Sequence, residues 1–196
     1  MQRSNCRITV TRGMYLYLAG LLLLLPLRWL IALSISAAVH ELFHLAAIRM
    51  FNLRVYGIQI GPFGARIRTE PMKPGQELLC ALAGPLGALS LLLAAKWMPM
   101  TALCAMFQSL YNLLPIYPFD GGRALRSAAS LVMPDKAATP VCAFLGRTVM
   151  ILLAVLLLGM MVRFHMGLLP LLVVFIHLLG RIRGKIPCKD AADRVQ

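Results

Sequence analysis

The sequence contains few acidic residues. Seven Asp and Glu residues stand against 20 Lys and Arg residues among 196, which gives a formal net charge of +13. Hydrophobic residues make up 60% of the chain, and its mean hydropathy is +0.78. Soluble domains are usually about 45–50% apolar. The composition therefore excludes an ordinary soluble domain and indicates an integral membrane protein.

Cysteine pairs are also absent. The five cysteines are scattered without a Cys-x-x-Cys spacing, which excludes a recognisable disulfide framework and a cysteine-based zinc site. The basic residues lie between apolar runs, and aromatic residues are not interleaved with them. This pattern argues against a nucleic-acid partner and favours orientation in, and attraction to, a lipid bilayer.

Six apolar runs predict an all-α polytopic membrane protein with about six transmembrane helices, since a helix needs about 20 residues to cross a bilayer. All but three of the 20 Lys and Arg residues lie in alternate connecting segments. The positive-inside rule then places both termini in the cytoplasm, and Arg123 and Arg126 are interpreted as anchors on that side. We expect the first run to be a retained membrane segment that begins at Met14, or earlier near Ile8. The runs are Met14–Leu25, Trp29–Met50, Leu78–Trp97, Thr101–Phe119, Val141–Val162 and Met166–Leu179.

A small β-hairpin is predicted after the second run. Residues 55–60 and 65–70 are separated by turn residues, and the second half alternates apolar and polar side chains. An open hairpin edge can accept an extended peptide by strand addition. The alternative is a hairpin that only closes the cytoplasmic mouth of the protein.

An ionisable pentapeptide interrupts the second apolar run. The sequence His40-Glu41-Leu42-Phe43-His44 puts charge into a predicted membrane segment, where a charged residue at the helix centre costs roughly 2.5–3.5 kcal/mol. Residues four apart lie on the same helix face. His40 and His44 can therefore bind one zinc ion, with Glu41 beside it as general base. A structural polar cluster is the alternative.

Two acidic residues are candidates for a third ligand, because a catalytic zinc ion takes three protein ligands and an open position. Asp120 follows Pro115 and Pro118, which break the helix, and such backbone is tolerated at membrane depth only against protein or a watery cavity. The predicted topology also puts Asp120 on the same side of the membrane as the two histidines. Glu77 begins the third run, where a carboxylate is favoured at a helix N-terminus. We predict Asp120 as the ligand; helix capping is its alternative role.

Three motifs in order resemble a known family. The pentapeptide at residues 40–44, the Ala-Gly-Pro-Leu-Gly sequence at 83–87 and the Asn-Leu-Leu-Pro-Ile-Tyr-Pro-Phe-Asp-Gly-Gly sequence at 112–122 resemble the site-2 protease family of intramembrane zinc metalloproteases. The resemblance covers about Ile8–Gly180. We expect the glycines of the second motif to permit close helix packing. The six-segment form with a basic hairpin is similar to the bacterial stage IV sporulation branch. That branch usually carries a CBS domain after the last helix, and we expect none here, because the chain ends soon after Gly180.

The resemblance implies roles for individual residues. The family positions that match His40, His44 and Asp120 bind Zn²⁺, and the position that matches Glu41 is the catalytic base. The position of Asn112 is associated with substrate binding near the metal. Interhelical hydrogen bonding is the alternative role for Asn112.

The implied activity is that of an intramembrane zinc endopeptidase. It would hydrolyse a membrane-associated protein near the cytoplasmic face, as in regulated intramembrane proteolysis. Residues 1–182 then form the metalloprotease domain and residues 183–196 a short basic cytoplasmic tail. The expected partners are this protein substrate, the lipid bilayer and a regulatory membrane partner. A metal-binding membrane transporter is the alternative.

Overall fold

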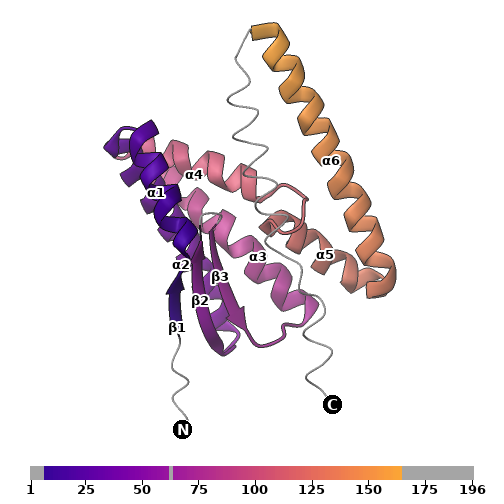
Figure 1. The fold of residues 1–196 in the computed structure, drawn as a ribbon. Helices are drawn as coiled ribbons and strands as arrows, with labels where there is room; N and C mark the ends of the chain where they lie inside the picture. Colours follow the sequence, from indigo (N-terminus) through magenta and orange to yellow (C-terminus); the bar gives the residue numbers. More distant parts are fainter. Residues whose placement is uncertain (1–6, 62–63, 165–196) are drawn as a thin grey trace.

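The computed structural model describes residues 7–61 and 64–164. A short strand comes first, a hairpin separates the second helix from the third, and the other elements are helical (Figure 1). The elements in chain order are β1 (Arg7–Val10), α1 (Arg12–Leu24), α2 (Leu27–Met50), β2 (Val55–Gly61), β3 (Gly64–Thr69), α3 (Pro74–Leu89), the 3₁₀ helix η1 (Ser90–Ala94), α4 (Pro99–Asn112), α5 (Asp120–Val132) and α6 (Asp135–Phe164).

Helix α3 is the centre of the helical packing. It contacts α2, α4 and α5, and α2 also contacts α4. Figure 1 shows the sheet beside these helices, with α1 along one side and α6 projecting past α5 on the other. A hydrophobic core of Ala47, Ile48 and Cys80 joins the end of α2 to α3 and to apolar side chains of the sheet. This core fixes the sheet against the helix that carries both histidines.

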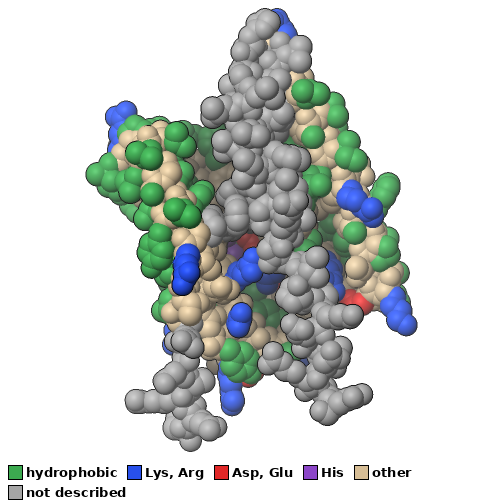
Figure 2. Space-filling model, in the orientation of Figure 1, with side chains coloured by type: hydrophobic (Ala, Val, Ile, Leu, Met, Phe, Trp, Pro, Cys, Tyr) green, Lys and Arg blue, Asp and Glu red, His purple; other side chains and the backbone are tan. Residues whose placement is uncertain are grey.

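The outer surface is apolar, as a membrane environment requires. Within the described residues, three helical segments are long and apolar enough to cross a bilayer: Leu27–Met50, Pro74–Ala94 and Asp135–Leu156. Helix α1 is apolar but shorter, and Leu23 on it is 88% exposed. Figure 2 shows hydrophobic side chains over α1 and α6. Of the six predicted crossings, Met166–Leu179 lies outside the described residues, as does the predicted tail at residues 183–196.

The predicted hairpin is present, but it belongs to a larger sheet. Strands β2 and β3 pair antiparallel, and β1 pairs parallel with β2, with Ile8 opposite Ile58 and Val10 opposite Ile60. The expectation that the first helix starts near Ile8 is therefore wrong. Residues 7–10 alternate polar and apolar side chains, which is a strand pattern, and the helix begins at Arg12.

Helix α2 ends in a Schellman motif. Asn52 adopts a left-handed φ of 55°, which Asn tolerates better than most residues. The Leu53 N–H then donates to Ile48 O at 3.2 Å, and the Asn52 N–H donates to Arg49 O at 3.0 Å. This pair of bonds satisfies carbonyls that the helix end leaves open and directs the chain into β2.

The fourth apolar run is not one helix, because its prolines stop α4. Helix α4 ends at Asn112, and the next helix, α5, starts at Asp120; this amphipathic helix was not predicted. Gly121 and Gly122 let the loop fold tightly over the start of α5. A Cβ on Gly121 would overlap the Leu113 carbonyl, and one on Gly122 would overlap the Ile116 main chain.

We predict that Gly121→Ala destabilises the protein by roughly 1–3 kcal/mol, because the added methyl group meets main-chain atoms that cannot turn aside. Thermal unfolding in detergent measures the loss. Gly75→Ala is the matched control, since a Cβ there meets nothing within 4 Å. Equal melting temperatures for the two variants would contradict the packing argument.

Candidate metal centre

Helix α2 presents His40 and His44 on one face. Both are buried, with 3% and 7% of their surfaces exposed. Their rings meet edge to face with centroids 4.7 Å apart, and the two Nε2 atoms are 3.1 Å apart. One turn of helix is therefore enough to bring two nitrogen donors to the same point.

Asp120 comes to the same point from the start of α5. Its Oδ2 atom lies 3.2 Å from His40 Nε2 and 3.4 Å from His44 Nε2. Phe119, the residue directly before Asp120, is 0% exposed and lies in a second apolar cluster with Ile116.

The three donor atoms fit a tetrahedral metal ion. Zinc binds histidine nitrogen and carboxylate oxygen at about 2.0–2.2 Å, so two ligand atoms of a tetrahedral site are about 3.3 Å apart. The observed separations of 3.1, 3.2 and 3.4 Å match this spacing. Among the described residues, these three side chains form the group of His, Cys, Asp and Glu that could hold a metal. They leave one tetrahedral position open, as a catalytic site requires.

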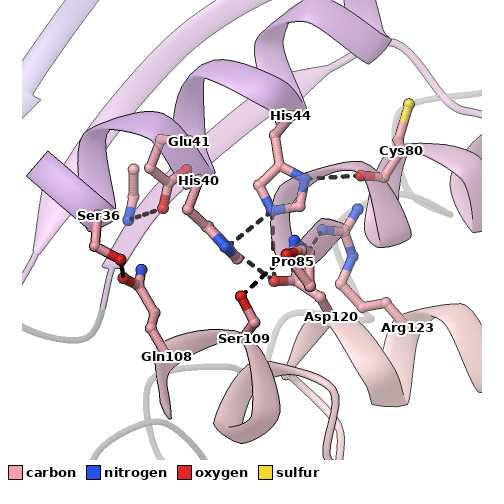
Figure 3. Close-up of polar contacts among 11 residues, drawn as sticks. Ser36, His40, Glu41, His44, Cys80, Pro85, Gln108, Ser109, Asp120 and Arg123 are labelled. Atoms are coloured by element: carbon pink, nitrogen blue, oxygen red, sulfur yellow. Dashed lines mark hydrogen bonds and ion pairs between the residues drawn. The ribbon is translucent and has the colours of Figure 1, made fainter. Parts of the chain in front are cut away.

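The far side of the His44 ring is fixed by α3 (Figure 3). His44 Nδ1 lies 2.7 Å from Cys80 O, and a carbonyl only accepts, so Nδ1 carries the proton and Nε2 turns its lone pair toward Asp120. A Cβ on Gly84 would overlap the His44 ring. Gly87 makes similar room for Phe43. The expected close packing of the glycine motif is thus present, and it fits around the histidine helix.

Arg123 holds the other oxygen of Asp120. Its Nη1 atom lies 3.6 Å from Asp120 Oδ1, and its Nε atom lies 3.6 Å from Glu77 Oε1. Glu77, the other candidate ligand, therefore pairs with an arginine instead of joining the histidines. The interpretation of Arg123 as an anchor missed this role. Its position three residues after Asp120, on the same face of α5, is the signal that could have revealed it.

Glu41 and Asn112 line the same cavity as the three donors. This cavity has a volume of about 460 Å³. Glu41 is half-buried, and its Oε1 atom accepts a hydrogen bond of 3.2 Å from the Ala65 N–H of β3. Asn112 is 3% exposed. All five residues singled out in the sequence thus border one cavity.

We predict that Arg123→Met lowers zinc affinity about 10- to 100-fold, because groups that orient a metal ligand typically contribute that much. Competition with a fluorescent chelator measures the affinity. Arg126→Met is the matched control, since Arg126 lies on the same helix and has no ion pair with Asp120 among the described residues. Unchanged zinc affinity in Arg123→Met would show that Asp120 needs no such support.

Comparison with known proteins finds sequence relatives and a solved structure with a similar fold. No family model matches the chain. It is 30% identical over 130 residues to stage IV sporulation protein FB of Bacillus subtilis, covering 57% of this chain and 44% of that protein. It is 25% identical over 137 residues to a zinc metalloprotease of Methanocaldococcus jannaschii, covering 63% of this chain and 40% of that protein. The match therefore spans less than half of either relative.

A solved structure shares the fold. The site-2 protease from Methanocaldococcus jannaschii superposes with a TM-score of 0.61 and 23% identity, covering 91% of this chain and 88% of that one. At this identity the likeness is evidence for the fold, and the two sequence relatives add the evidence for descent. The chain is thus similar in sequence to a sporulation protein and a zinc metalloprotease, and it shares the fold of a site-2 protease.

Proposed function

We propose that the protein is an intramembrane zinc endopeptidase that hydrolyses a peptide bond of a membrane-associated protein near the cytoplasmic face, in regulated intramembrane proteolysis. The observation that carries this proposal is the buried triangle of His40, His44 and Asp120, whose donor atoms have the spacing of a tetrahedral zinc site. A membrane protein rarely buries such groups without a function.

The chemistry follows from the residues around that triangle. A zinc ion bound by His40, His44 and Asp120 would supply the Lewis acidity that activates water and polarises a carbonyl. Glu41 follows His40 directly in the chain and lines the same cavity. Its carboxylate accepts a proton from the attacking water and returns it to the amine nitrogen of the leaving peptide. The three ligands and one base account for each step of peptide hydrolysis.

Strand β3 offers a way to hold the substrate. It is an edge strand of the sheet formed by the described residues, and consecutive residues from Gly64 to Ile67 line the cavity. A peptide added along this edge is extended, which exposes its carbonyls to the metal centre. This arrangement supports strand addition over a hairpin that only closes the mouth.

The membrane topology is the remaining part of the proposal. In Figure 1 the α5–α6 corner and the Arg54-to-Lys73 region around the hairpin lie toward one end of the molecule, and the α1–α2 turn lies toward the other. The first two regions carry most basic residues of the described connections. This distribution supports a multi-pass protein with a cytoplasmic metal centre.

We predict that Glu41→Gln keeps stoichiometric zinc and lowers proteolysis by about 10²- to 10⁴-fold, the range that a general base contributes. The first measurement compares the membrane proteome of cells producing wild-type or Glu41→Gln protein, to find products that disappear. The second follows cleavage of such a substrate by purified protein. Full proteolysis by Glu41→Gln would contradict the assignment of the base. Zinc transport by both proteins in vesicles, without any proteolysis, would favour a transporter.

We predict that Asp120→Asn reduces zinc content far more than Glu77→Gln does, because only Asp120 reaches the histidines. Metal analysis of the two purified variants after dialysis against a weak chelator makes the comparison. The variants are a matched pair, since each replaces one carboxylate by an amide of the same shape. Full zinc in Asp120→Asn together with zinc loss in Glu77→Gln would identify Glu77 as the ligand.

A further inference from the structure

Two cavities meet beside Glu41. The first contains the metal centre, and the second, of about 930 Å³, is largely apolar and lies between α1, α2, α4 and the sheet. Glu41 of α2, Ala65 of β3, and Gln108 and Asn112 of α4 border both cavities. A peptide that passes from the apolar cavity to the metal centre must cross this junction.

Gln108 is held at the junction by a buried serine. The Ser36 Oγ–H donates to Gln108 Oε1 at 2.6 Å, and Ser36 is 0% exposed. Ser36 lies one turn before His40 on α2, and Gln108 lies one turn before Asn112 on α4. Figure 3 shows Gln108 reaching from α4 to Ser36, on the side of His40 that faces Glu41. The serine thus fixes which way the amide points.

The Nε2 group of the Gln108 amide has hydrogen-bond donors that are not used. A glutamine amide has one acceptor oxygen and two N–H donors. Its oxygen is engaged by Ser36, whereas Nε2 has no hydrogen-bond partner within residues 7–61 and 64–164. Gln108 is half-buried, and its exposed part borders the cavities. Donors are therefore present where the apolar cavity opens toward the metal centre.

An extended peptide at this junction needs such donors. Its main-chain groups alternate in direction, so pairing with β3 on one side leaves carbonyls directed to the other side. An unpaired carbonyl in an apolar cavity is costly. At the junction, helix α4 offers the amide donors of Gln108 to those carbonyls.

We propose that Gln108 is a substrate-binding residue that donates a hydrogen bond from Nε2 to a main-chain carbonyl of the peptide next to the scissile bond, with Ser36 as the residue that orients its amide. This proposal rests on the proposed peptidase function and adds a residue to it. It makes binding dependent on the peptide main chain and independent of the peptide's side chains at that position.

A neighbouring residue separates this role from simple helix packing. The Ser109 Oγ–H donates to Pro85 O at 3.0 Å and ties α4 to α3. Ser109 is buried and borders neither cavity. Ser109→Ala therefore removes an interhelical hydrogen bond from the same helix without touching the junction.

The experiment compares two zinc-binding probes on zinc-loaded protein in detergent. Acetohydroxamate binds the metal alone, whereas a tripeptide hydroxamate binds the metal and also presents main-chain carbonyls. We expect Gln108→Met to weaken the tripeptide hydroxamate about fivefold or more, the value of one neutral hydrogen bond, and to leave acetohydroxamate unchanged. Gln108→Glu keeps an acceptor for Ser36 and lacks the donors, so we expect the same selective loss. Ser109→Ala should change neither affinity.

Each contrary outcome has a definite meaning. Equal tripeptide affinity in wild type and both Gln108 variants would overturn the proposal. Equal losses for both probes would also overturn it, because they would show that Gln108 only supports the metal centre. If Gln108→Met does not fold, the Gln108→Glu result decides alone. Failure of acetohydroxamate to bind the zinc-treated wild type would instead refute the proposed metal centre, and this inference with it.

Discussion

The centre depends on holding three electron-rich atoms together in a buried space. Two imidazole nitrogens and one carboxylate oxygen lie 3.1–3.4 Å apart. Lone pairs that face each other at this distance are unfavourable unless a proton or a cation lies between them, and burial removes the water that would otherwise screen them. The local helix geometry brings only His40 and His44 together. Asp120 has to be added by tertiary packing, so the fold around α5 determines whether the group forms.

Helix α3 supplies none of the three donors, yet it positions them. The Cys80 carbonyl of this helix orients His44, and Gly84, which has no side chain, leaves room for the His44 ring. The Glu77 carboxylate pairs with Arg123, the arginine beside Asp120. These contacts come from a helix that touches α2, α4 and α5. In a membrane, where apolar packing between helices has little hydrophobic driving force, small residues and polar ties of this kind determine helix association.

Much of the centre was predictable because its signals are local. A four-residue spacing specifies the histidine pair, and two prolines with two glycines mark the loop before Asp120. The hairpin was visible as alternation between turn residues. Strand β1 was missed because its alternation covers only four residues and lies directly before the first apolar run. Helix α5 was missed because its polar residues made this segment resemble a connection between two apolar runs. The pair of Arg123 and Asp120 has a three-residue spacing that could have been noticed. The contacts of Arg123 with Glu77 and of Gln108 with Ser36 join separate helices, which no spacing in the sequence encodes.

The bond from the Ala65 N–H to Glu41 has a consequence for the timing of events at the centre. Ala65 pairs with Ile60 on one side, and its N–H points away from that partner to the Glu41 carboxylate. A single amide proton makes one strong hydrogen bond. In the proposed peptidase, a substrate strand that accepts this hydrogen bond would displace Glu41 Oε1, so strand addition would also release the carboxylate. Without a peptide at the β3 edge, the Ala65 N–H remains bound to Glu41 Oε1.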